Sequence, residues 1–247
     1  MIVSKRHGLF PLICTGLVLT LFTIAPPLAC QAVETLIVDF SRKTVSASGE
    51  ELIIGTIYFK APEDVIITVD SPVLQWSIFE GANLLIYYPL ERRAFRFISR
   101  NRLLIPFAQS FIGLVREDFG LSDAGFFLQE NRKRGDVLIT VWRPPRAVRA
   151  YIGEARIGMQ RYDKKVHPLF LELLDPEGNL LTRTTYLEYR EDLEPSFPGR
   201  ILILQNGEEG EVRDEIRYSG HRINQVLPAE VTGFHLPSDV SVEELKW

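Results

Sequence analysis

The sequence predicts a mainly β (α+β) fold, in which a meander of strands curves toward a barrel and one helix covers the concave face of the sheet. Runs that alternate between apolar and polar residues follow one another after residue 33, at a spacing of about ten residues. Such alternation is typical of β-strands, and short strands at regular spacing indicate a meander that closes toward a barrel. Residues 106–119 have apolar residues at helical spacing instead.

The first thirty residues precede this fold and have the order of a secretion signal. Lys5 and Arg6 are followed by residues 9–29, which contain no charged side chain. Basic residues before an apolar segment that ends in small residues are typical of a signal peptide. We therefore expect residues 1–29, or 1–32 with a later cleavage point, to be removed and residues 30–247 to form a single domain. The alternative is an uncleaved anchor, because the apolar segment is long enough for a membrane-spanning helix.

Two cleavage points compete, and they decide whether the mature protein is tethered. Leu28-Ala29-Cys30 is close to a lipobox, in which a cysteine after a small residue receives diacylglycerol, although Pro27 stands where that motif has an aliphatic residue. Ordinary cleavage after Ala32 is the other interpretation. Lipidation of Cys30 would add membrane contact through acyl chains worth roughly 0.8 kcal/mol per buried methylene. Cys14 lies inside the signal, so no internal disulfide is expected.

The mature chain alternates in short runs that are rich in β-branched and aromatic residues. These runs fall at residues 51–60, 65–69, 76–78, 84–88, 95–97, 137–141, 169–173, 201–203 and 216–218. They are separated by turn residues, which are found at 61–64 (APED), 71–72 (SP), 80–83 (EGAN), 175–179 (DPEGN) and 206–207 (NG). Asn and Gly tolerate a positive φ, and Pro fixes φ at the first corner of a turn. Residues 190–200, which are charged and contain two prolines, are expected to form a loop.

The helical segment has a start and a stop signal. Pro106 suits the first turn of a helix, and Gly120 suits the position after its end. We expect an amphipathic helix over residues 106–119, with its apolar stripe packed on the concave face of the sheet. The apolar residues at helical spacing are Leu103 and Leu104, just before this helix, and Phe107, Phe111, Leu114 and Val115 within it.

Charge and motifs exclude several classes of function. The formal net charge is −4, which gives no electrostatic reason to expect nucleic acid and argues against adsorption to anionic lipid by charge alone. The four histidines have no metal-ligand spacing, and no phosphate loop, GxGxxG or GxSxG motif is present. We therefore expect no metal, no cofactor and no enzymatic activity. A scattered catalytic set acting on lipid or peptidoglycan is the alternative.

Large apolar side chains are concentrated between residues 37 and 119. One interpretation is an ordinary core. The other is that part of this surface lines a cavity for an acyl chain, because a curved sheet with a helix against it encloses such a space. The residues predicted to line the cavity are Phe59, Ile67, Trp76, Ile78, Leu85, Tyr87, Phe95, Phe97, Phe107 and Phe111.

The order of motifs resembles that of the outer-membrane lipoprotein carrier family (LolA, with the related receptor LolB). Residues 38–43 (VDFSRK) resemble the family's opening block, and residues 55–62 (GTIYFKAP) resemble its strand and turn that end in proline. The resemblance continues through residues 71–72 (SP), 79–89 (FEGANLLIYYP), 175–179 (DPEGN) and 234–242 (FHLPSDVSV). It spans residues 34–247 in all.

The resemblance implies an incomplete β-barrel, formed by a curved antiparallel sheet with covering helices, around a cavity for the acyl chains of a lipoprotein. It implies a periplasmic protein that takes part in lipoprotein sorting to the outer membrane, with an inner-membrane transporter or an outer-membrane receptor as partner. The sequence departs from the family pattern at Ala61, where the carrier has an arginine. It also leaves no room for a helix before the first strand, and Cys30 suggests a tether to a membrane.

Two hypotheses of different classes follow. The first is a periplasmic or outer-membrane-tethered carrier or receptor that binds lipoprotein acyl chains or another lipid in its cavity. The second is an envelope structural or adaptor protein, or a general lipid binder, that shares the fold without transferring lipoproteins, since a fold does not fix a function.

Overall fold

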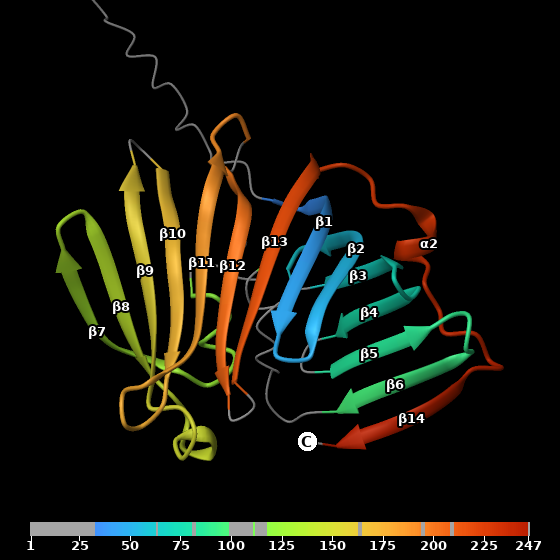
Figure 1. The fold of residues 1–247 in the computed structure, drawn as a ribbon. Helices are drawn as coiled ribbons and strands as arrows, with labels where there is room; N and C mark the ends of the chain where they lie inside the picture. The colour runs from blue at the N-terminus through green and yellow to red at the C-terminus, as the bar shows by residue number, and fades with distance from the viewer. Residues whose placement is uncertain are drawn as a thin grey trace, which may run out of the picture. The chain divides into compact units, whose positions relative to one another are not determined.

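Fourteen strands join in one sheet (Figure 1). The computed structural model describes residues 33–62, 64–80, 83–98, 111, 118–162, 165–193, 196–207 and 210–246. Residues 31–247 make up one compact unit. The strands are β1 (Thr35–Ser46), β2 (Gly49–Lys60), β3 (Asp64–Ser71), β4 (Gln75–Glu80), β5 (Asn83–Tyr88), β6 (Arg93–Ile98), β7 (Phe127–Arg134), β8 (Val137–Arg143), β9 (Glu154–Tyr162), β10 (Lys165–Leu174), β11 (Leu180–Arg190), β12 (Phe197–Gly207), β13 (Gly210–Ile223) and β14 (Ser241–Lys246).

The sheet consists of two meanders joined side by side. Strands β1 to β6 pair in sequence, as do β7 to β13, and β13 then pairs antiparallel with β1. The C-terminal strand β14 adds to β6 in parallel, so β14 and β7 are the two edges of the sheet. The sheet curves without closing. The predicted mainly β fold and incomplete barrel are thereby confirmed.

One face of the sheet carries the hydrophobic core, and we call it the inner face. Leu36, Val38 and Phe40 of β1 point to this face and are buried, because successive strand side chains alternate between faces. Their register partners on β2 and β13, such as Ile57 and Tyr218, continue the same layer. Phe119, Leu121, Ala124 and Phe126, from the turns that precede β7, complete the core.

The opposite, outer face is crossed by the segment that leads to β14. This segment contains the short helix α2 (Ala229–Thr232), whose Val231 is buried. The ring of Phe234 stacks on Trp76 with centroids 5.0 Å apart and lies 6.0 Å from the ring of Tyr87. The C-terminal segment is therefore held to the outer face by aromatic packing.

The predicted helix over residues 106–119 lies mostly outside the described residues. Phe111 is helical and buried, and its ring lies 6.2 Å from that of Phe59. Residues 118 and 119 belong to a run of turns instead, so the prediction extends too far at its C-terminal end. The carboxylate of Asp118 accepts hydrogen bonds from the amides of Gly120 and Ser122, which favours a turn over a further helical residue.

The predicted loop over residues 190–200 is shorter than expected. β12 begins at Phe197, which is buried and pairs with Arg190 of β11. Burial of the aromatic ring and the ladder to β11 outweigh the loop signal of the charged residues and of the two prolines, the second of which, Pro198, lies within β12 and pairs with Tyr189. A short 3-10 helix, η1 (Arg146–Val148), follows β8.

Candidate functional site

A cavity of about 570 Å³ lies on the inner face of the meander β1 to β6. The strand register aligns its centre: Ile67, Ser77, Ile86 and Phe95 are successive partners on β3, β4, β5 and β6 and so share one face. Ligand cavities usually measure roughly 300–1,000 Å³, so this one is large enough for part of a lipid. The lining residues are Phe40, Arg42, Glu51, Ile53, Ile67, Val69, Pro72, Val73, Gln75, Ser77, Phe79, Leu84, Ile86, Tyr88, Glu91 and Phe95.

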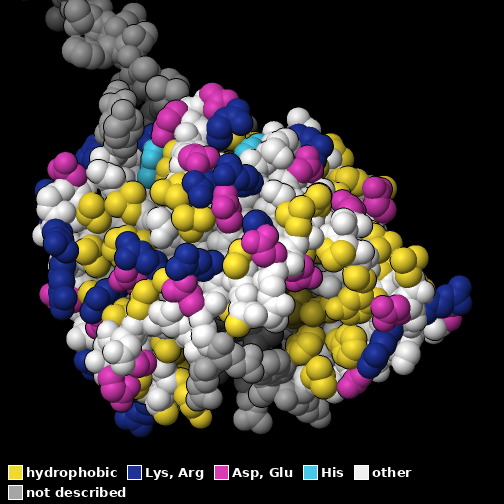
Figure 2. All heavy atoms as spheres, viewed as in Figure 1, with side chains coloured by type: hydrophobic (Ala, Val, Ile, Leu, Met, Phe, Trp, Pro, Cys, Tyr) yellow, Lys and Arg dark blue, Asp and Glu magenta, His cyan; other side chains and the backbone are white. Residues whose placement is uncertain are grey.

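The walls of this cavity are mainly aliphatic and aromatic. Its polar members are few, namely Arg42, Glu51, Gln75, Ser77 and Glu91. In Figure 2, hydrophobic side chains gather over the part of the sheet that carries β4 to β6, whereas charges of both signs are interspersed over β9 to β13. An apolar cavity with a few polar side chains suits an alkyl chain.

An ion pair links the cavity to the second meander. The guanidinium of Arg42 donates to both carboxylate oxygens of Asp214 on β13, with Nε–Oδ1 and Nη2–Oδ2 distances of 3.0 and 2.9 Å. Thr44 Oγ1 donates to the same carboxylate at 2.5 Å. The side chain of Asp214 is only 1% exposed, and that of Arg42 is 25% exposed. The buried carboxylate of Asp214 is therefore paired with a cation at the junction of the two meanders. A buried charge needs such a partner to offset the cost of its desolvation.

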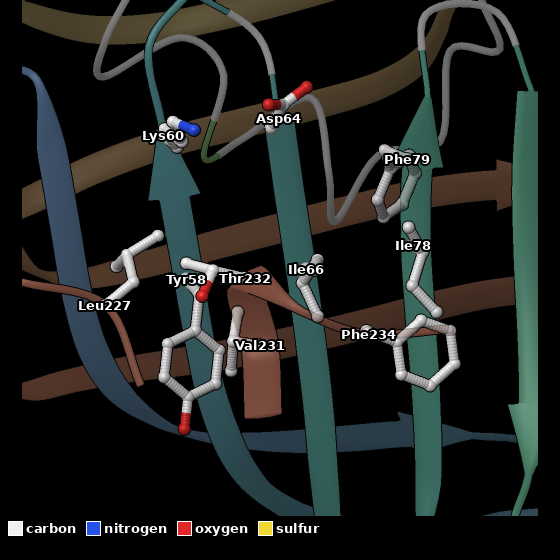
Figure 3. Close-up of a pocket in the computed structure, with 10 residues that line it drawn as sticks. All are labelled: Tyr58, Lys60, Asp64, Ile66, Ile78, Phe79, Leu227, Val231, Thr232 and Phe234. Atoms are coloured by element: carbon white, nitrogen blue, oxygen red, sulfur yellow. The ribbon is translucent and has the colours of Figure 1, made fainter. Parts of the chain in front are cut away.

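A second, smaller hollow of about 230 Å³ lies on the outer face beneath the C-terminal segment (Figure 3). Apolar side chains form most of it, and Lys60 and Asp64 lie together at one end. It is lined by Tyr58, Lys60, Asp64, Ile66, Ile78, Phe79, Leu227, Val231, Thr232 and Phe234. Its volume is less than half that of the inner cavity, so the inner cavity is the better candidate for an acyl chain.

The structure distributes the predicted lining residues over both faces. Ile67 and Phe95 line the inner cavity, and Phe59 and Phe97 share its face. Phe111 packs on Phe59 in the core. The residues of the opposite face are Trp76, Ile78, Leu85 and Tyr87, while Phe107 and Cys30 lie outside the described residues.

Several lining residues were missed by sequence reasoning, and a signal for two of them was present. The strands of the β4–β5 hairpin pair directly up to Glu80 and Asn83, with two residues between them. In a two-residue hairpin Phe79 is opposite Leu84, so these two side chains lie on the same face of the sheet. Ile78, the neighbour of Phe79, lies on the other face. The other missed side chains on the cavity wall include Phe40, Ile53, Val69, Ile86 and Tyr88.

A separate polar cluster lies where β10 begins and β11 ends. The buried imidazole of His167 has its Nε2 3.0 Å from Ser196 Oγ and stacks on Tyr189, with centroids 4.2 Å apart. Burial and then the charge of Glu191 raise the pKa of Tyr189 above its ordinary value, and its hydroxyl donates to the carbonyl of Pro168. Glu191 Oε1 is 3.6 Å from His167 Nδ1, too far for the acid–imidazole hydrogen bond of a hydrolytic triad. The contacts of His167 and Tyr189 hold the β11–β12 loop against β10.

The described ranges have no group of three or more His, Cys, Asp or Glu side chains arranged to hold a metal ion. None of their helices combines the length and apolar character needed to span a bilayer.

Replacing Phe234 with alanine should loosen the C-terminal segment without affecting the inner cavity. The change removes two ring contacts and part of the cover of the outer face, so we expect a loss of about 2 kcal/mol in the free energy of unfolding. Urea denaturation measures this loss. Phe127→Ala, at a surface ring that is half exposed, is the matched control and should change stability by less than about 0.5 kcal/mol. Equal unfolding midpoints for the two variants would refute the anchoring role of Phe234.

Comparison with known proteins rests on structure, because the sequence matches no family model and no curated protein. A domain described as an outer membrane lipoprotein-sorting protein, from Vibrio parahaemolyticus, superimposes with a TM-score of 0.59 at 16% identity, over 78% of this chain and 87% of its own. A LolA superfamily protein from Nitrosomonas europaea superimposes with a TM-score of 0.54 at 19% identity, over 80% and 89%.

This chain has the LolA-like fold. A DUF1329 family protein from Desulfovibrio piger ATCC 29098 also superimposes, with a TM-score of 0.59 at 12% identity, over 81% of this chain and 90% of its own. The predicted resemblance to LolA-like proteins is thus confirmed at the level of the fold. Within it, the cavity on β1 to β6 lies on the inner face of the curved sheet.

Proposed function

We propose that this protein is a periplasmic or membrane-tethered carrier or receptor that holds the acyl chains of a lipoprotein in its inner cavity. The observation that carries the proposal is the apolar cavity of about 570 Å³ on the concave side of a LolA-like sheet. A carrier works by binding and release, with no bond made or broken. Its partners would be a lipoprotein and either an inner-membrane transporter or an outer-membrane receptor.

The amino-terminal segment supports an envelope location for this function. Its basic, apolar and small residues are in the order of an export signal, and Cys30 offers a site for lipidation. Acylation would make the protein a tethered receptor, whereas cleavage after Ala32 would make it a diffusing carrier. The intact masses of the mature protein from membrane and soluble fractions distinguish these two forms.

Native mass spectrometry of the mature protein tests whether the cavity is occupied. We expect a population whose added mass equals one acylated molecule, and uptake of a fluorescent fatty acid after that molecule is extracted. A protein that carries no lipid and takes up none would refute the carrier and the general lipid binder together, and would leave a structural or adaptor role.

A general lipid binder is the second candidate, and a specific observation favours it. Ala61 stands where the LolA carrier has the arginine that is implicated in cargo handover. Transfer of a purified lipoprotein to an acceptor membrane separates the two candidates. A carrier or receptor accelerates this transfer, whereas a general binder takes up fatty acid and leaves the transfer rate unchanged.

A further inference from the structure

The edge hairpin β7–β8 concentrates positive charge in an otherwise acidic protein. Residues 127–151 contain six Lys or Arg side chains and two acidic ones, whereas the rest of the chain contains 22 basic and 30 acidic side chains. Charges beyond about 10 Å are largely screened at physiological salt, so a surface responds to the local charge and not to the net charge. The hairpin therefore presents a basic surface despite the acidic total.

Several basic side chains of this hairpin are exposed and available to bind an external anion. Every residue of β7 is exposed. Arg132 pairs with Glu130 at 2.7 Å, and Arg143 Nε donates to Gln129 at 3.2 Å. Within the described part of the chain, Lys133, Arg134 and Arg146 have no ion-pair partner. These three side chains would gain the most electrostatic stabilisation from binding an external anion.

Apolar side chains are exposed beside these charges. Phe127 and Leu128 are each 47% exposed, Leu138 is 45% exposed, and Tyr151, just after η1, is 75% exposed. Lys133 and Leu138 are register partners, so a cation and an aliphatic side chain lie next to each other on one face. Phe127 is on the opposite face from Leu128, and because β7 is an edge strand both faces can be approached together.

We propose that the β7–β8 hairpin is a docking surface for an anionic lipid bilayer. Lys133, Arg134 and Arg146 would approach the lipid phosphates, while Phe127, Leu128 and Leu138 would enter the interfacial region. Charge alone would suit a nucleic acid or an acidic protein equally well. Exposed apolar side chains among the cations favour a bilayer, whose surface offers phosphates and hydrocarbon together.

This proposal does not rest on the proposed function, because the hairpin and the inner cavity occupy different parts of the sheet. The cavity is formed by β1 to β6, and β7 is the far edge beyond β8 to β13. A variant that fails to dock should still take up fatty acid, and a variant with a blocked cavity should still dock. Fatty-acid uptake and vesicle docking therefore test the cavity and the hairpin independently.

Sedimentation with lipid vesicles tests the docking surface. The protein carries Cys30→Ser, so that no acyl anchor contributes, and is mixed with phosphatidylcholine vesicles with or without phosphatidylglycerol. We expect binding to the anionic vesicles alone, with release at high salt. Each basic side chain near an anionic surface changes partitioning by about fivefold, so Lys133→Glu with Arg134→Glu should lower binding at least tenfold.

Arg92→Glu with Arg93→Glu is the matched control, because it makes the same charge change at exposed positions by the other edge. This control should lower binding less than threefold. Phe127→Ser with Leu128→Ser should lower binding several-fold without changing the salt dependence. Equal losses in the two charge variants would overturn the proposal. Binding to phosphatidylcholine alone, binding to an oligonucleotide in preference to vesicles, or no binding at all would overturn it too.

Discussion

Replacing Ile86 with aspartate should lower the affinity for a fatty acid at least about tenfold, which corresponds to about 1.4 kcal/mol. Ile86 lies in the middle of the row that crosses the inner cavity, between its partners Ser77 and Phe95. A carboxylate at this position would need to stay hydrated, and an alkyl chain in the cavity would displace that water. Titration with a fluorescent fatty acid measures the loss.

Leu85→Asp is the matched control for this variant. Leu85 adjoins Ile86 on the same strand but faces the outer side, where Ile78 is its partner. Both variants introduce the same charge at a half-buried position of β5, so circular dichroism and thermal unfolding should show similar stabilities. Loss of binding in Leu85→Asp with normal binding in Ile86→Asp would place the lipid on the outer face and refute the inner cavity as its site.

Replacing Asp214 with alanine should lower the free energy of unfolding by about 3–5 kcal/mol, the usual cost of breaking a buried ion pair from one side. The carboxylate is almost fully buried and receives hydrogen bonds from Arg42 and Thr44. Its removal takes away the carboxylate that pairs with the mostly shielded guanidinium of Arg42 where β13 meets β1. Urea denaturation, followed by far-ultraviolet circular dichroism, gives the change directly.

The double variant Asp214→Leu with Arg42→Met is the control for that result. Replacing both members of a buried pair by apolar side chains is often neutral or stabilising, because no charge then remains to be desolvated. We therefore expect the double variant to recover most of the stability lost in Asp214→Ala. A loss below about 1 kcal/mol in Asp214→Ala would show that the pair does not hold the two meanders together.

Strands whose two faces differ in polarity could be predicted from the sequence. In β3 the apolar Val65, Ile67 and Val69 alternate with Thr68 and Asp70, in β6 Phe95 and Phe97 flank Arg96, and a turn that contains proline precedes each strand. The structure confirms these strands because the local pattern and the burial of one face favour the same backbone. β7 could not be found in this way. Its sequence, FLQENRKR, buries nothing and forms a strand through its ladder to β8.

The lining of the cavity was harder to predict than the strands, because it depends on which face each strand turns inward. Alternation identifies two sets of residues in a strand but not which set faces the core. The predicted site combined Leu85 and Tyr87 of one face with Phe95 and Phe97 of the other. The register of the β5–β6 pair, in which Ile86 meets Phe95, separates these sets, and that register is a tertiary feature.

The crystal structure of the mature protein loaded with a fatty acid tests the central claim most directly. We predict that the alkyl chain lies on the inner face of β3 to β6, in contact with Ile67, Ile86 and Phe95. An inner cavity filled by the protein's own side chains, or an alkyl chain bound in the outer hollow beneath α2, would contradict the claim.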